Sequence, residues 1–206
     1  MGRPTLRFVP AACVVAACTA VIAWWTMGFR AFTTDGHALL AAGSLPRPAP
    51  SITLAEPSGT ITATDQLRGR YVLLTFMYLG CTDVCRIVEA QLHVALAALD
   101  ELVPERLVLV SLSFDPKTDS DEALAAHWER HARPRGWIMG RLADTPDEAQ
   151  LKDLARLGVW VYRRPDGGYN HAAFTFLIDP NGWVIDVFPP DTPAADIVRA
   201  VRDAVG

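Results

Sequence analysis

A continuous apolar run rich in strand-forming residues, YVLLTFM at positions 71 to 77, constrains the class of fold open to this chain. Such a continuous apolar run is typical of a central strand whose two faces are both covered. A second run of this kind covers residues 106 to 114, and a helical segment, residues 83 to 100, lies between them. Two buried strands joined through a helix predict a parallel sheet with helices packed against it.

Strands and helices continue to alternate through the rest of the chain. Residues 51–54 and 60–62 flank a Pro-Ser-Gly turn and predict a small hairpin. The Asp-Pro-Asn-Gly turn at 179–182 predicts another. The other expected elements are strands at 137–142, 174–178 and 183–188 and helices at 120–132, 146–157 and 193–205. This order predicts an α/β sandwich of the thioredoxin type, with an N-terminal hairpin, a parallel core and an antiparallel edge.

The N-terminus predicts a membrane anchor. Residues 8–29 carry no charge over 22 positions and follow Arg3 and Arg7. As a helix they would span about 33 Å, close to the hydrocarbon thickness of a bilayer. The basic flank predicts a single-pass helix in a bacterial inner membrane, with the remaining chain in the periplasm. Two alternatives remain: a signal peptide cleaved after Ala20, and a lipoprotein signal ending at Cys18.

Three segments follow from this pattern: an anchor (1–30), a linker (31–50) that ends in alternating prolines, and a folded domain (51–206). Only 3 of the 19 basic residues precede residue 31, so residues 31–206 hold 16 basic and 23 acidic side chains, a formal charge of −7. An acidic domain excludes a nucleic-acid-binding surface of the usual basic kind.

Two cysteines, Cys81 and Cys85, come directly after the first central strand. Ligands of open α/β sheets gather at the carboxyl ends of strands, and residues four apart share one face of a helix. A helix N-terminus is expected to favour their thiolate forms. Three interpretations stay open at this point: a structural disulfide, a redox-active pair, or part of a site for a soft metal, which would need a third ligand.

Five histidines are candidates for that ligand. His127 and His131 belong to the sequence HWERH, which lacks the zincin pattern, and we expect them on a solvated helix face. We expect His93 to be a surface or packing residue, while His37 lies in the linker. His171 lies in a loop before the strand at 174–178, and in a thioredoxin-type fold the turn before that strand faces the start of the cysteine-bearing helix.

The stretches FMYLGCTDVC (76–85) and NHAAFTFLIDPNGWV (170–184) resemble the Sco/SenC family, whose members are membrane-anchored assembly proteins of cytochrome c oxidase. The likeness covers about residues 52 to 205. It includes residues 110–119, which resemble a family strand followed by a D-x-x-x-D loop. The resemblance implies a copper site on a thioredoxin-like domain, with the ligands Cys81, Cys85 and His171.

The sequence departs from the family pattern close to these ligands. Thr82 and Arg86 follow the two cysteines where the family commonly has proline. Gly80 and Asn170 stand where a histidine and an aspartate are often found. The resemblance therefore implies intact ligands with altered neighbours.

The function implied by the resemblance is that of a copper metallochaperone for the dinuclear copper site of oxidase subunit II, rather than of an enzyme. Copper would bind as Cu(I), with Cu(II) as a second possibility. The alternative is an exported thiol–disulfide oxidoreductase with Cys81 and Cys85 as its catalytic pair. A further periplasmic copper carrier or a thiol reductant would be additional partners.

Asp115 and Asp119 allow two interpretations. Asp119 is placed to cap the helix that follows, with Glu122 at the capping-box position, and Asp115-Pro116 is typical of a turn. The other interpretation gives both carboxylates a role at the edge of the site or in binding a partner.

Overall fold

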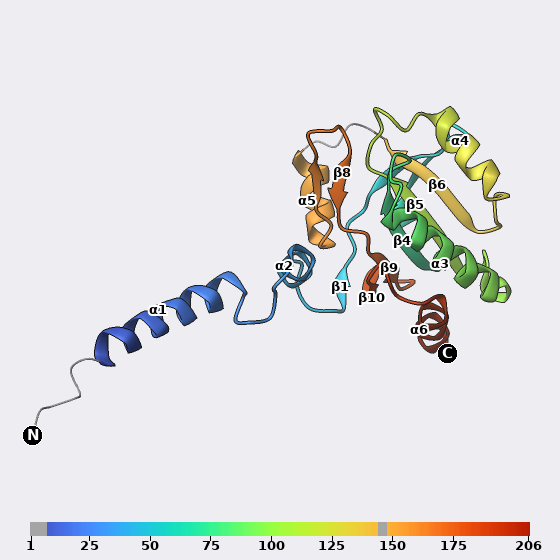
Figure 1. The fold of residues 1–206 in the computed structure, drawn as a ribbon. Coiled ribbons are helices and arrows are strands. Elements are labelled where there is room, and N and C mark those ends of the chain that lie inside the picture. The colour runs from blue at the N-terminus through green and yellow to red at the C-terminus, as the bar shows by residue number, and fades with distance from the viewer. Residues whose placement is uncertain (1–7, 144–147) are drawn as a thin grey trace, which may run out of the picture.

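The structure, a computed structural model, describes residues 8–143 and 148–206. Its main sheet has eight strands in the order β1-β10-β9-β4-β5-β6-β2-β3 (Figure 1). The strands are β1 (Arg47–Pro48), β2 (Thr53–Ala55), β3 (Ile61–Ala63), β4 (Tyr71–Met77), β5 (Leu107–Ser113), β6 (Trp137–Leu142), β9 (Thr175–Ile178) and β10 (Trp183–Phe188). Strands β4, β5 and β6 run parallel, whereas the other pairings are antiparallel. The predicted parallel core, antiparallel edge and N-terminal hairpin are thus confirmed.

Helices cover both faces of the sheet. The first face carries α3 (Val84–Ala98), α4 (Asp121–Arg130) and α6 (Ala194–Val205), which share one apolar core. The other face is covered by α5 (Glu148–Arg156) and by α2 (Thr34–Ala41), whose Leu39 packs against the second core. Two short 3-10 turns, 64–67 and 100–102, complete the connections.

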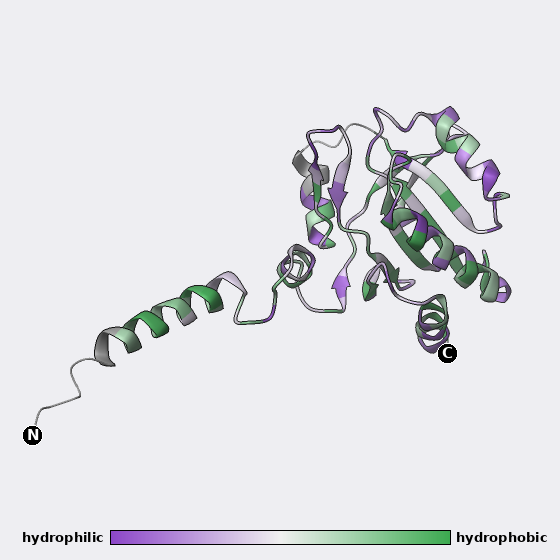
Figure 2. Ribbon diagram, in the orientation of Figure 1, coloured by the Kyte–Doolittle hydropathy of each residue, from purple (hydrophilic) through white to green (hydrophobic). Residues whose placement is uncertain are grey.

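Alternation along the central strands builds these two cores. In β4, Leu73 and Met77 face the α3 side, whereas Val72, Leu74 and Phe76 face the opposite side. All five side chains are buried, which explains why the run is apolar at nearly every position. Figure 2 shows the resulting hydrophobic colour along the central strands.

The N-terminal residues form helix α1 (Phe8–Trp25), which extends away from the sheet (Figure 1) and is hydrophobic along much of its length (Figure 2). Among the residues that the structure describes, no helix has the length and apolar character needed to cross a membrane. The predicted transmembrane helix at 8–29 therefore has no support from the structure.

Helix α2 occupies part of the segment expected to be a linker. Its Asp35 accepts a hydrogen bond of 2.7 Å from the indole N–H of Trp160, which links the helix to the residue just before β7 (Val161–Arg163). Arg47, which lies in β1 and is buried, donates to the carbonyl oxygens of Gly43 and Leu157. These contacts attach residues 34–48 to the sandwich.

Candidate metal centre

Cys81 and Cys85 lie at the carboxyl end of β4, where the chain turns into helix α3. Cys81 is in the turn, and its amide donates to the carbonyl of Tyr78 at 3.1 Å. Cys85 is the second residue of α3, and its amide donates to the sulfur of Cys81 at 3.3 Å. Asp83, the N-cap residue, makes no capping bond with its side chain. Both thiols are free and partly buried.

His171 completes the group from a distant part of the chain. It ends β8 (Tyr169–His171), which pairs with β7 (Val161–Arg163) in a separate two-stranded sheet. The residue is thus the end of a strand, rather than part of the loop predicted from sequence. Its Nε2 lies 3.4 Å from Sγ of Cys85. The three possible ligand atoms of Cys81, Cys85 and His171 all lie within 4.8 Å of one another.

The environment of His171 holds its ring in a form suited to binding a metal. Nδ1 lies 2.9 Å from the carbonyl oxygen of Ala172, which can only accept, so Nδ1 carries the proton. Burial lowers the pKa of His171, although the Ala172 carbonyl acts in the opposite direction. The ring is therefore neutral near pH 7, and the Nε2 lone pair faces the cysteines. A metal-bound histidine commonly donates its other N–H to a carbonyl in this way.

Aromatic side chains pack around the same ring and fix its plane. Tyr78 and Phe114 stand with ring centroids 5.7 and 5.0 Å from that of His171. The hydroxyl of Tyr78 donates to the backbone carbonyl of Tyr169 at 3.4 Å, which joins the turn after β4 to β8. The position of His171 relative to the cysteines is therefore set by packing on two sides.

The protonation of Cys85 differs from the expectation based on the helix N-terminus. Burial raises the pKa of Cys85, and the neighbouring Cys81 raises it further through a hydrogen bond and its charge. These effects outweigh the helix start, because desolvation penalises the charged form of a group removed from water. Without a metal, Cys85 is a thiol near pH 7, and a metal that binds it must displace a proton.

The donor set suits copper. Two sulfurs and one imidazole nitrogen are the soft ligands that select Cu(I) or Zn(II) over hard cations, and three convergent donors satisfy a three-coordinate ion. Partial exposure of Cys81 leaves one side of the group accessible from solvent.

Asp119 supports the turn that carries Cys81. It is buried, and its carboxylate accepts hydrogen bonds from the amide of Leu79 at 2.9 Å and from the hydroxyl of Ser113 at 2.5 Å. Burial raises its pKa despite these two donors. The suggestion that Asp119 caps α4 is wrong, because Ser120 is the N-cap and accepts from the amide of Ala123.

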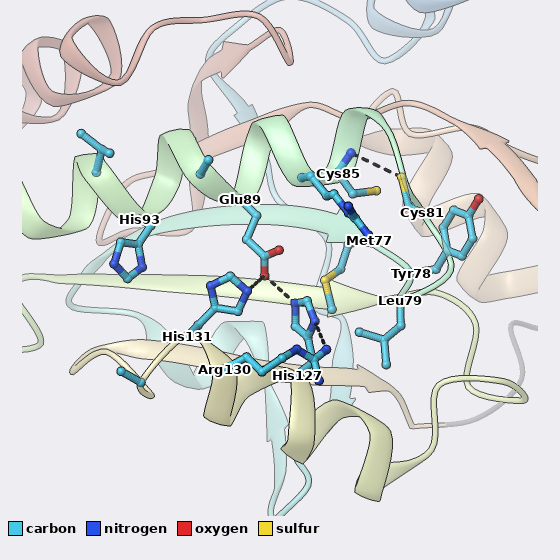
Figure 3. Close-up of a pocket in the computed structure, with 14 residues that line it drawn as sticks. Met77, Tyr78, Leu79, Cys81, Cys85, Glu89, His93, His127, Arg130 and His131 are labelled. Carbon is cyan, nitrogen blue, oxygen red and sulfur yellow. Dashed lines mark hydrogen bonds and ion pairs between the residues drawn. The ribbon is translucent and has the colours of Figure 1, made fainter.

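A cavity of about 730 Å³ opens beside the cysteines (Figure 3). Cys81 and Cys85 line one end of it, and Glu89, His127 and His131 line another part of its wall. The expectation that His127 and His131 lie on a solvated helix face is wrong, since both rings turn inward toward Glu89 of α3. The spacing of the two histidines in HWERH does not indicate that Glu89 contacts either ring.

Comparison with known proteins agrees with the geometry. The family model described as SCO1/SenC matches residues 47–206. A SCO2-like protein of Rickettsia typhi is 27% identical over 157 residues, covering 73% of this chain and 74% of the relative. Protein sco1 of Schizosaccharomyces pombe is 22% identical over 171 residues, with 79% and 63% covered.

Solved structures share the fold. A SCO1/SenC family lipoprotein from Bacillus anthracis superposes with a TM-score of 0.69 at 23% identity, covering 79% of this chain and 97% of the other. ScoI of Bradyrhizobium japonicum, solved with copper bound, gives 0.64 at 19% identity, with 77% and 99% covered. The family match spans the whole sandwich, including both cysteines and His171, and on this basis the chain belongs to the SCO1/SenC family.

Proposed function

We propose that this protein is a copper carrier that assists the assembly of the dinuclear copper site in subunit II of cytochrome c oxidase. The observation that carries the proposal is the convergence of two thiols and one neutral imidazole within 4.8 Å. A solved relative is described as a member of the Sco family of cytochrome c oxidase assembly proteins, and others were solved with copper bound.

The chemistry of capture follows from the three side chains. Cys85 gives up its proton as the metal binds, because the coordinating form of cysteine is the thiolate. Cys81 supplies the second sulfur, also as a thiolate, and His171 supplies Nε2 without losing a proton, since its proton is already on Nδ1. Soft sulfur donors stabilise Cu(I) over Cu(II), so Cu(I) is the form carried.

Release requires that a partner reach the metal. The cysteines line a cavity that is open to solvent, so ligands of an acceptor protein can enter the coordination sphere before the cysteines leave. Ligand-by-ligand exchange avoids a free ion in solution. We place this exchange in the bacterial periplasm, with residues 8–29 as the membrane anchor, because subunit II exposes its copper site in that compartment.

A second function, thiol–disulfide exchange, is favoured by the contact between Cys81 and Cys85. Cys81, the residue nearer the strand turn, would attack a partner disulfide, and Cys85 would then displace the partner. Two electrons pass to the partner, which gains two thiols, while Cys81 and Cys85 become a disulfide. A Sco-family relative was solved in work that identified a disulfide switch.

The change of His171 to Ala separates the two functions. It removes one of three copper ligands and should weaken Cu(I) binding at least tenfold, the scale found even for partners that only orient a ligand. It leaves both thiols in place, so the disulfide should still form and be reduced. The matched control is His37→Ala, which removes a histidine from α2 and should change neither property.

The measurements are a competitive Cu(I) titration and a disulfide-exchange assay on the same preparations. A Cys81→Ser/Cys85→Ser variant should lose both activities, because an alcohol is a hard and poorly ionised ligand. Copper binding that survives in this variant would refute the carrier proposal. Copper binding that survives in His171→Ala while exchange collapses would make thiol exchange the better assignment.

A further inference from the structure

A second group of metal-binding side chains lies in the same cavity as the cysteines. Glu89 projects from α3, and His127 of α4 and His131, the C-cap residue of α4, point toward it (Figure 3). Oε1 of Glu89 lies 2.7 Å from Nε2 of His127 and 3.4 Å from Nε2 of His131. The side chains are only 14%, 17% and 29% exposed, respectively. Two imidazoles thus converge on a single carboxylate oxygen.

Spacing of the three donor atoms fits a small metal ion. All three lie within 4.8 Å of one another. Bonds of about 2.0–2.2 Å to a tetrahedral ion place its ligand atoms about 3.3–3.6 Å apart. The His131–Glu89 separation is already in that range, and the His127–Glu89 pair has to open by less than about 1 Å. We expect a rotation of side chains to suffice, because both imidazoles already contact the Glu89 carboxylate.

We infer that Glu89, His127 and His131 form a second metal site, specific for a borderline divalent ion such as Zn(II) or Cu(II). Two nitrogens and one carboxylate oxygen are harder donors than the thiolates of Cys81 and Cys85, and imidazole suits Zn(II) and Cu(II). The cavity leaves a fourth position open to water or to a ligand from another protein. The two groups therefore differ in donor softness, so the cysteine group favours Cu(I) and the Glu89 group favours a divalent ion.

Arg130 determines how readily this second site is filled. Its guanidinium lies 3.0 Å from Nδ1 of His127 and can only donate, so Nδ1 is the acceptor and the proton of the ring is on Nε2. A metal can bind Nε2 only once the ring proton has moved from Nε2 to Nδ1, and Nδ1 is then a donor that faces the donating guanidinium, which forces Arg130 to turn away. Arg130 therefore competes with the metal, both through this hydrogen bond and through its positive charge.

The test uses the full chain with the first site removed by Cys81→Ser, Cys85→Ser and His171→Ala. This background should bind one Zn(II) or Cu(II) ion per chain by isothermal titration. Its Cu(II) form should show nitrogen hyperfine coupling in electron paramagnetic resonance and no thiolate-to-copper absorption band. Glu89→Gln or His131→Ala, added to the background, should each weaken binding at least tenfold. His37→Ala should leave it unchanged, and Arg130→Ala should tighten it.

The triple variant tests the second site independently of the first, because it retains none of the proposed Cu(I) ligands. If the background binds no ion, or if binding persists at full strength in His131→Ala, the inference is refuted. Should the triple background fail to fold, the wild-type chain with its 4 cysteines alkylated serves in its place. Titration of that protein with and without Glu89→Gln gives the same two outcomes.

Discussion

Replacement of Asp119 tests whether the metal-binding turn is held from outside the metal centre. Asp119→Ala removes a buried carboxylate that accepts two hydrogen bonds, one from the partly buried amide of Leu79 and one from the buried hydroxyl of Ser113. A buried donor left without a partner costs about 1–3 kcal/mol. The Ser113 hydroxyl can rotate toward another acceptor, whereas the Leu79 amide is fixed. We therefore expect a loss of about 2–4 kcal/mol of unfolding free energy, near the low end for two such donors.

Urea denaturation of the Asp119→Ala variant gives the stability, and a Cu(I) titration gives its effect on the site. Leu79 is two residues before Cys81, so a loosened turn should also weaken copper binding, by about tenfold, as for other residues that orient ligands. Asp191→Ala is the matched control, because it removes an exposed carboxylate and should change stability by less than about 0.5 kcal/mol. An Asp119→Ala protein as stable as this control would refute the reasoning.

Asp119→Asn adds a dependence on pH to the same experiment. The variant keeps an oxygen acceptor but cannot ionise. Since burial raises the pKa of Asp119 in the folded state, the folded protein binds this proton more tightly than the unfolded chain does. The stability of the wild type relative to Asp119→Asn should thus be greatest below the unfolded pKa and fall as pH rises through the folded value. If the stability of the wild type relative to Asp119→Asn instead increases with pH, the reasoning is contradicted.

Three further outcomes are expected. Because Cys85 has a raised pKa and must lose a proton to bind copper, and Cys81 also binds as a thiolate, the apparent Cu(I) affinity should rise at least about tenfold per pH unit between pH 6 and 8; a flat titration profile would contradict this. Gly140→Ala should lower the unfolding free energy measured by urea denaturation by about 1–3 kcal/mol, because the added carbon would lie 2.6 Å from the carbonyl oxygen of Ala55 in β2; an unchanged midpoint would show that β2 can shift to make room at no cost. Deletion of residues 1–30 should leave a soluble domain with the unfolding midpoint of the full chain, since α2 and the sandwich remain; aggregation would show that the fold needs the N-terminal helix.

Strong local patterns in the sequence were sufficient to predict the sandwich. The predicted strands at 137–142 and 183–188 have the same bounds as β6 and β10, because apolar runs and the turn between residues 179 and 182 limit them sharply. Strand β1 was not predicted, since Arg47–Pro48 carries no strand pattern and forms only by pairing with β10. The β7–β8 pair was missed because its polar, glycine-containing sequence is typical of a loop.

The candidate site was predictable only in part. Cys81 and Cys85 are close in sequence, so their proximity follows from the short turn that leads from β4 into α3. His171 was reached through the family resemblance, because no local rule brings a residue 86 positions away to Cys85. Glu89 was missed for the same reason. Glu89 and His127 are 38 positions apart in the sequence, and their contact depends on how α3 and α4 are placed on the sheet.

The long separation of His171 from the cysteines has a consequence for the unfolded chain. An ion bound to both Cys85 and His171 links two residues that are 86 positions apart and so closes a loop in the chain, as a disulfide would. The unfolded chain cannot hold these ligands together without a large loss of conformational entropy, so the ion binds the folded state far more tightly. Loading therefore acts as a reversible crosslink, and the melting temperature should rise with ion concentration and fall back when the ion departs. The protein without the ion is in this respect less stable than the protein that holds it.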